Sequence, residues 1–267
     1  MIKISHECPL QILRESYLFN DYDYCLVHLT NNDWKYKNYY MRSVKKGRDV
    51  LLDNSIFELG KSFDPKRFVK KILQLQPTQY IVPDVLDDGN GTIVKFQEFK
   101  NITSNIRLGG VKIGVVQGKT YEEIKKCYDF MSKNADKIAI SFNMKYFLEN
   151  EEGSCDLDKF AIGRPNLIKK LQDEGIWNKQ KPHHLLGCAL YEEFSKNREF
   201  YNTSFIESVD TSNPVVAGIF GLKYDGVRGL KEKPGIKLCD LINEKLSKKQ
   251  IDTIMYNICM FREGLNG

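Results

Sequence analysis

The sequence contains no long apolar run, and this absence excludes one broad class of protein. No segment approaches the ~20 consecutive apolar residues that a membrane-spanning helix requires. Residues 1–7 mix charged and apolar side chains and lack the sustained apolar stretch of a secretory signal peptide. We therefore expect a protein that acts in the cytoplasm and has no membrane partner.

The cysteines show no ligand or disulfide pattern. They are odd in number, widely scattered and never in Cys-x-x-Cys spacing, at positions 8, 25, 127, 155, 188, 239 and 259. Such thiols indicate a reducing compartment and give no basis for a disulfide framework or a structural zinc site. No Gly-x-Gly-x-x-Gly or Walker-type phosphate loop follows any predicted strand. We therefore expect neither a metal nor a cofactor.

What the chain does contain is an alternation of apolar runs and helical patterns. Its 267 residues, 42% of them hydrophobic and 28% charged, suffice for one globular domain over 1–267. The net charge of +5 permits a polyanionic partner but does not by itself indicate one. The predicted strands are residues 24–29, 50–53, 79–82, 112–118, 137–142, 183–189 and 205–214, with an eighth within 215–222. The predicted helices are 65–74, 92–106, 121–134, 166–174, 191–201 and a C-terminal helix, 238–261. This alternation predicts a (β/α)₈ barrel.

Several predicted strands end in a polar side chain or glycine, namely at Asp53, Asp84, Gln117, Gly187 and Asp210. Ligands of parallel β/α folds gather at the carboxyl ends of the strands. One such aspartate alone is more often a turn or a helix cap, but the recurrence favours a site. Paired carboxylates without metal ligands suggest substitution at an anomeric carbon, in which one attacks and another transfers protons.

Two basic segments suggest contacts with nucleic acid. Residues 30–48 read as a polar insertion loop in which aromatic residues alternate with cations, among them Lys45, Lys46 and Arg48. Residues 223–237 form a second basic segment, with Arg228 and Lys231. An equally weighted alternative for the first segment is a solvated insertion whose aromatic side chains pack on the barrel.

Short motifs at the strand ends resemble those of the tRNA-guanine (queuine) transglycosylase superfamily, in the family's order. The most specific is Gly114-Val115-Val116-Gln117-Gly118, which is similar to the family's Gly-Ile-Val-Gln-Gly segment. Leu52-Asp53-Asn54-Ser55-Ile56-Phe57-Glu58 resembles its Asp-Ser-Gly-Gly/Ala-Phe-Gln segment, Leu185-Leu186-Gly187-Cys188-Ala189 its Gly-Gly-Leu-Ala segment, and Val209-Asp210-Thr211-Ser212 its Phe-Asp-Ser-Ala segment. Val82-Pro83-Asp84 resembles the segment with the family's purine-reading aspartate.

The resemblance implies a role for each matching residue. Asp210 would be the nucleophile at C1′, with Glu207 as a rival, and Asp53 the general acid and base. The residues implied to bind the base are Asp84, Gln117, Gly187, Cys188, Asn54 and Ser55. No Cys-x-Cys-x₂-Cys…His zinc module is present, so the chain looks more like the compact, zinc-free DpdA-type branch, often phage-encoded, that modifies DNA.

The resemblance therefore implies exchange of guanine in DNA for a 7-deazaguanine such as 7-cyano-7-deazaguanine, in the host cytoplasm if the chain is phage-encoded. One alternative is a tRNA-directed enzyme with the same chemistry. The other is a non-catalytic nucleic-acid-binding subunit of the superfamily. Three acidic strand ends favour an enzyme, because a surface that only binds polyanions has no use for clustered carboxylates.

Overall fold

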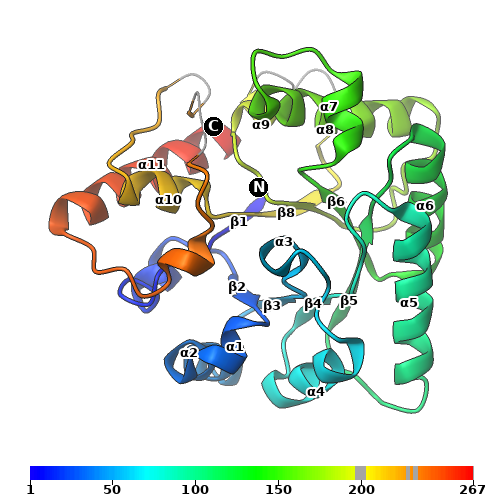
Figure 1. Cartoon of the computed structure of the whole chain (residues 1–267), viewed down its shortest axis with the longest axis horizontal. Helices are drawn as coiled ribbons and strands as arrows, with labels where there is room; N and C mark the ends of the chain where they lie inside the picture. Colours follow the sequence, from blue (N-terminus) through cyan, green and yellow to red (C-terminus); the bar gives the residue numbers. More distant parts are fainter. Residues whose placement is uncertain (196–202, 227–228, 231–233, 267) are drawn as a thin grey trace. The chain divides into compact units, whose positions relative to one another are not determined.

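A computed structural model describes residues 1–195, 203–226, 229–230 and 234–266 (Figure 1). The chain divides into two compact units. Unit 1 consists of Met1–Asp21, Ser141–Lys179 and His184–Gly267, and unit 2 of Tyr22–Ile140 and Gln180–His183. The prediction of a single domain over 1–267 stays a prediction.

Eight strands form one sheet in the order β1-β8-β7-β6-β5-β4-β3-β2, and the pairs with a defined register are all parallel. The strands are β1 (Lys3–His6), β2 (Asp23–Leu26), β3 (Val50–Asp53), β4 (Gln79–Ile81), β5 (Val111–Val116), β6 (Lys137–Ser141), β7 (His183–Leu186) and β8 (Ile206–Thr211). Helices alternate with these strands along the chain (Figure 1). The predicted (β/α)₈ fold class is therefore confirmed.

The α-helices are α1 (Leu29–Asn32), α2 (Trp34–Lys45), α3 (Ile56–Leu59), α4 (Pro65–Leu75), α5 (Gly89–Thr103), α6 (Tyr121–Asn134), α7 (Lys145–Asn150), α8 (Asp156–Asp173), α9 (Glu192–Ser195), α10 (Asn213–Ile219) and α11 (Lys248–Asn266). Two 3₁₀ turns, η1 (Glu15–Leu18) and η2 (Leu238–Leu241), complete the set. The best-predicted helices have clear N-terminal caps: Asp64 accepts from the Arg67 amide before α4, and Thr120 from the Glu123 amide before α6. No helix in the described part of the chain is both long and apolar enough to cross a bilayer.

Two strand predictions were wrong. The sheet includes β1, which the sequence reading missed, because its four residues contain the polar Ser5 and His6. The apolar run at 215–222, predicted as the eighth strand, is instead helix α10, which starts at Asn213 with Pro214 in its first turn. A short apolar run does not distinguish a buried strand from a buried helix. Here the helix packs against α11 so closely that a Cβ on Gly218 would lie 2.5 Å from Ile254 Cγ1.

The insertion loop predicted at 30–48 is also wrong, since α1 and α2 occupy most of it. The Asp33 carboxylate caps α2 by accepting the amides of Lys35 and Tyr36. Tyr36, Tyr40 and Ser43 recur at helical spacing and are buried, so the aromatic residues mostly pack against the sheet, as the alternative interpretation held.

The other predicted helices differ mainly at their ends. The C-terminal helix begins at Lys248, ten residues later than predicted, after the η2 turn. The helix predicted at 191–201 is described only as α9, because 196–202 lie outside the described residues.

Candidate active site

In unit 2, the ends of β3, β4 and β5 bring together an acid–amide cluster, consisting of Asp53, Asn54, Asp84 and Gln117. All four side chains are buried. The Asn54 amide donates to Asp84 Oδ1 at 2.8 Å, and the Gln117 amide donates to Asp84 Oδ2 at 2.9 Å. Of the predicted strand-end residues of this unit, Asp84 and Gln117 are therefore in direct contact, and Asn54 joins them.

Asp84 is the centre of this cluster. Burial raises the pKa of Asp84, and the hydrogen bonds from Gln117 and Asn54 oppose that rise. Because both amide groups donate, the carboxylate accepts at each oxygen and retains lone pairs for further donors. The amide of Asp87 donates to Gln117 Oε1 at 3.2 Å, which fixes the orientation of the Gln117 side chain.

Asp53 is held by the turn that follows β3. The backbone N–H of Ser55 donates to Asp53 Oδ2 at 2.6 Å, with Ser55 in the left-handed conformation (φ 59°). The Ser55 hydroxyl accepts from the His28 amide at 3.4 Å. Ser55 therefore shapes the turn instead of presenting a free hydroxyl, whereas Asp53 lies at the carboxyl end of its strand as predicted.

In unit 1, Asp210 lies near the carboxyl end of β8 and is anchored through one oxygen. His184 Nε2 lies 3.0 Å from Asp210 Oδ1, and the Gly187 amide donates to the same oxygen at 3.1 Å. The other nitrogen of His184 lies 2.9 Å from Ser208 Oγ. Among the described residues, the hydrogen bonds to this carboxylate all fall on Oδ1 and none on Oδ2.

Glu207, the rival nucleophile, is poorly placed for that role. Side chains alternate between the two faces of a strand, so Glu207 points away from the face that carries Ser208 and Asp210. It lies near the start of β8 and forms an ion pair with Lys3 at 3.7 Å. Of the two carboxylates, Asp210 is therefore the buried one near the carboxyl end of β8.

The turn after β7 presents the Gly187 amide to Asp210. Gly187 has φ 64°, a conformation that favours glycine. The fully buried Arg164 of α8 pairs with Glu193 through two hydrogen bonds of 2.8 and 2.9 Å, and donates to the Leu186 carbonyl at 2.7 Å. A buried ion pair thus secures both ends of this turn.

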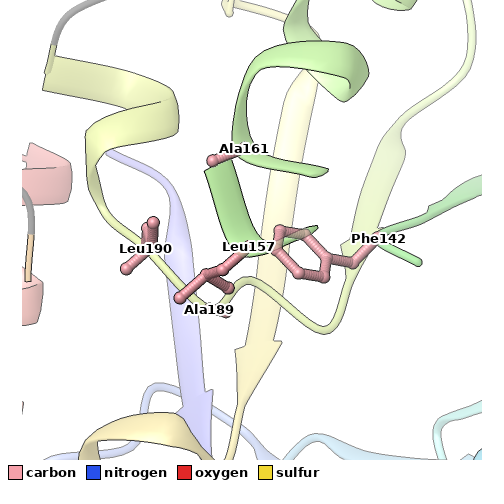
Figure 2. Close-up of a cluster of buried hydrophobic side chains, with 5 residues drawn as sticks. All are labelled: Phe142, Leu157, Ala161, Ala189 and Leu190. Atoms are coloured by element: carbon pink, nitrogen blue, oxygen red, sulfur yellow. The ribbon is translucent and has the colours of Figure 1, made fainter. Parts of the chain in front are cut away.

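An apolar cluster supports the same turn (Figure 2). Phe142 packs with Leu157 and Ala161 of α8 and with Ala189 and Leu190, which follow the turn. The Arg164 guanidinium stands over the Phe142 ring at 5.1 Å. The helix that carries Arg164 is therefore packed directly against the segment it holds.

The side chain of Cys188, a predicted substrate contact, lies in the protein interior. Its thiol is fully buried and lies 3.3 Å from Glu193 Oε1. Burial first, and then the charge of Glu193, raise the pKa of this thiol well above its ordinary value, so it stays protonated. The segment contributes to the site through its backbone, and the Cys188 amide donates to the Asp210 carbonyl at 2.8 Å.

The predicted nucleic-acid contacts have mixed outcomes. Arg48 is a structural residue, because its guanidinium forms two hydrogen bonds of 3.0 Å with the buried carboxylate of Asp23. Lys45 and Lys46 are exposed, but they lie at the end of α2 that precedes the start of β3. Arg228 and Lys231 lie outside the described residues.

His184, Arg164 and Glu193 were not singled out from the sequence. A signal existed for two of them: His184 stands directly before the apolar residues Leu185 and Leu186 of a predicted strand, and Arg164 occupies the otherwise apolar face formed by Ala161, Ile168 and Leu171. Among the described residues, no group of three or more His, Cys, Asp or Glu side chains is arranged to hold a metal ion. Comparisons with protein-family models and with curated proteins found no match to this chain.

Proposed function

We propose that this protein is a DNA-guanine transglycosylase that replaces guanine with a 7-deazaguanine, such as 7-cyano-7-deazaguanine. The observation that carries the proposal is Asp210, a strand-end carboxylate with one oxygen anchored by two donors and the other left for attack. The motifs quoted above imply the same role for this residue. The protein would act in a reducing cytoplasm, and a duplex target would have to flip the guanine out before reaction.

The proposed reaction has two balanced steps. Asp210 Oδ2 attacks C1′ of the nucleotide, the C1′–N9 bond breaks, and its electron pair leaves with guanine as Asp53 supplies a proton. The incoming 7-deazaguanine then attacks C1′ through N9, Asp53 takes its N9 proton, and the ester bond to Asp210 breaks. No cofactor is consumed, because one base replaces another.

The acid–amide cluster supports the choice of guanine as the leaving base. The Asp84 carboxylate can accept from the N1–H and 2-amino groups of guanine, and the Gln117 amide has a second N–H with which to donate to O6. Adenine lacks both donors on that edge and has an amino group in place of O6. Because Asp84 and Gln117 are buried, a base whose hydrogen-bonding edge does not match them would leave a buried polar group unpaired, which costs binding free energy.

The test is to trap the covalent intermediate. The protein is incubated with guanine-containing DNA or tRNA without an acceptor base, then denatured, and the adduct is mapped by mass spectrometry. We expect a DNA adduct on Asp210, none with Asp210→Ala, and an undiminished adduct with the matched control Glu207→Ala. Addition of 7-cyano-7-deazaguanine should give the modified nucleoside in the digested DNA.

Three results would contradict the proposal in different ways. An adduct on Glu207 would move the nucleophile, and an adduct with tRNA alone would select the tRNA-directed alternative. Binding of DNA without any adduct or base exchange would select the non-catalytic alternative.

A further inference from the structure

Three cations of unit 2 stand on the neighbouring helices α2 and α4: Lys37 on α2, and Arg67 and Lys71 one turn apart on α4. The pKa of Lys71 is lowered by partial burial and then by the positive charges of Lys37 and Arg67. Like charges on neighbouring helices repel each other, and a bound anion reduces that repulsion. We name Lys37, Arg67 and Lys71 the α2–α4 basic face.

The start of α4 is attached directly to the acid–amide cluster. The Phe63 amide donates to the Asn54 carbonyl at 3.2 Å, and the Ser62 hydroxyl donates to the Asp84 carbonyl. The Arg67 guanidinium stands over the Phe63 ring at 5.2 Å. The basic face therefore begins next to the residues that we propose to read the base.

The start of α2 lies at the same edge of the sheet. The amide of Leu26, the last residue of β2, donates to the Tyr36 hydroxyl at 2.9 Å, which places the first turn of α2 at the carboxyl end of that strand. The same turn carries Trp34, whose side chain is 69% exposed. An exposed indole beside clustered cations is the combination that holds a polynucleotide by stacking and by phosphate contacts.

Lys45 and Lys46 lie at the other end of α2. The helix has 12 residues, and a helix of that length spans about 18 Å. These lysines precede β3, whose carboxyl end carries Asp53. They are therefore separated from the acid–amide cluster by the length of the helix, although the sequence pattern pointed to them.

We propose that the α2–α4 basic face binds backbone phosphates of the DNA strand whose base reaches the acid–amide cluster, with Trp34 stacking on a neighbouring base. This inference rests on the proposed function for its choice of DNA. It assigns the binding to Lys37, Arg67, Lys71 and Trp34 instead of to Lys45, Lys46 and Arg48.

The experiment compares two variants with the same change in net charge. The test variant is Lys37→Gln/Arg67→Gln/Lys71→Gln, and the control is Lys45→Gln/Lys46→Gln/Arg107→Gln, whose three cations precede β3 or β5. Each is titrated against a fluorescent DNA oligonucleotide over a series of KCl concentrations. The test variant should lose about 2 to 3 units of salt slope, since each lost phosphate contact removes roughly 0.7 to 0.9 units.

The control should keep the salt slope of the unmodified protein. Trp34→Ala should weaken binding roughly 5- to 150-fold and leave the slope unchanged, because stacking releases no counterions. Equal loss of slope in both triple variants would overturn the proposal, since net charge alone would explain it. Binding of RNA but not DNA would overturn the choice of DNA.

Failure of this proposal is distinguishable from failure of the proposed function. If the unmodified protein exchanges bases while the test variant keeps its full salt slope, the surface assignment is wrong and the reaction stands. If the test variant loses salt slope but the unmodified protein forms no adduct, the surface assignment stands and the reaction is wrong.

Discussion

Asp210 depends on a histidine for its orientation. A neutral imidazole satisfies both of the contacts that His184 makes when Nε2–H donates to Asp210 Oδ1 and Nδ1 accepts from the Ser208 hydroxyl. Ser208 lies two residues before Asp210 on the same face of β8, deeper along the strand. In this chain of hydrogen bonds, Asp210 lies nearest the carboxyl end of the strand, where ligands of parallel β/α folds gather. This position supports the proposed carboxylate nucleophile over a serine one.

His184→Phe should slow the covalent step and leave DNA binding intact. Loss of the Nε2 contact frees the carboxylate to rotate, and a misplaced nucleophile costs up to about 100-fold in rate. The single-turnover rate of adduct formation at saturating DNA should fall about 10- to 100-fold, and Ser208→Ala should have a smaller effect. An unchanged adduct rate in His184→Phe would show that the Gly187 amide alone orients Asp210.

The sequence predicted strand-end residues better than the contacts between them. Asp53, Asp84, Gln117 and Asp210 each follow an apolar run, so their placement is a local property of a parallel strand. The partner of a buried polar group depends on which strands and helices become neighbours. For that reason the sequence could mark His184 and Arg164 as polar residues with apolar neighbours, but it could not give their partners or the burial of the Cys188 thiol against Glu193.

At the scale of elements, α8 holds the turn after β7 through an ion pair that is entirely buried. Each charge compensates the other, and the Leu186 carbonyl satisfies a further donor of Arg164. Removing one partner of such a pair is costly because the other charge stays buried and unpaired. Glu193 also accepts from the Cys188 thiol, so the pair links α8, α9 and the turn.

Arg164→Met should therefore destabilise the protein by about 3–5 kcal/mol. The double variant Arg164→Met/Glu193→Leu should recover part of that loss, because no unpaired charge remains. The matched control is Lys169→Met/Asp173→Leu, an exposed pair on the same helix, which should cost less than about 1 kcal/mol. Urea unfolding measures all three, and a double variant less stable than Arg164→Met would contradict the argument.

The errors in predicted elements have physical causes. The helix at 34–45 was missed because its alternation of aromatic and basic residues was read as a surface pattern, although Asp33 and the spacing of Tyr36 and Tyr40 fit a capped amphipathic helix. Segment 215–222 was misread because an apolar run that short has no distinguishing period. The total of eight strands was right only because one wrong strand replaced the missed β1.

At the scale of the whole molecule, the sheet order shows how a missed strand completes the fold. β1 pairs with β8, and Ser5 is in register with Asp210. His6 faces the opposite side of the strand and packs against Phe19 and Phe261, with ring centroids 6.2 and 5.6 Å away. Neither ring nitrogen of His6 has a hydrogen-bond partner among the described residues.

This buried imidazole makes folding stability depend on pH. Burial, and then the charge of Arg262, lower the pKa of His6 from 6.5 to about 3. Above pH 6.5 the histidine is neutral in both states and has no effect. As the pH falls from 6.5 towards about 3, only the unfolded state binds the proton, so stability decreases by up to ~1.4 kcal/mol per pH unit.

His6→Leu should remove this component of the pH dependence. At pH 7 it should be as stable as the unmodified protein to within about 1 kcal/mol, because an apolar side chain of similar size replaces two unpaired nitrogens. At pH 5 it should be the more stable of the two by about 2 kcal/mol. Urea unfolding between pH 7 and pH 4.5 provides the measurement, with His28→Gln as a control at a partly exposed histidine. Parallel stability curves for His6→Leu and the unmodified protein would mean that His6 takes up a proton in the folded state and is not sealed between Phe19 and Phe261.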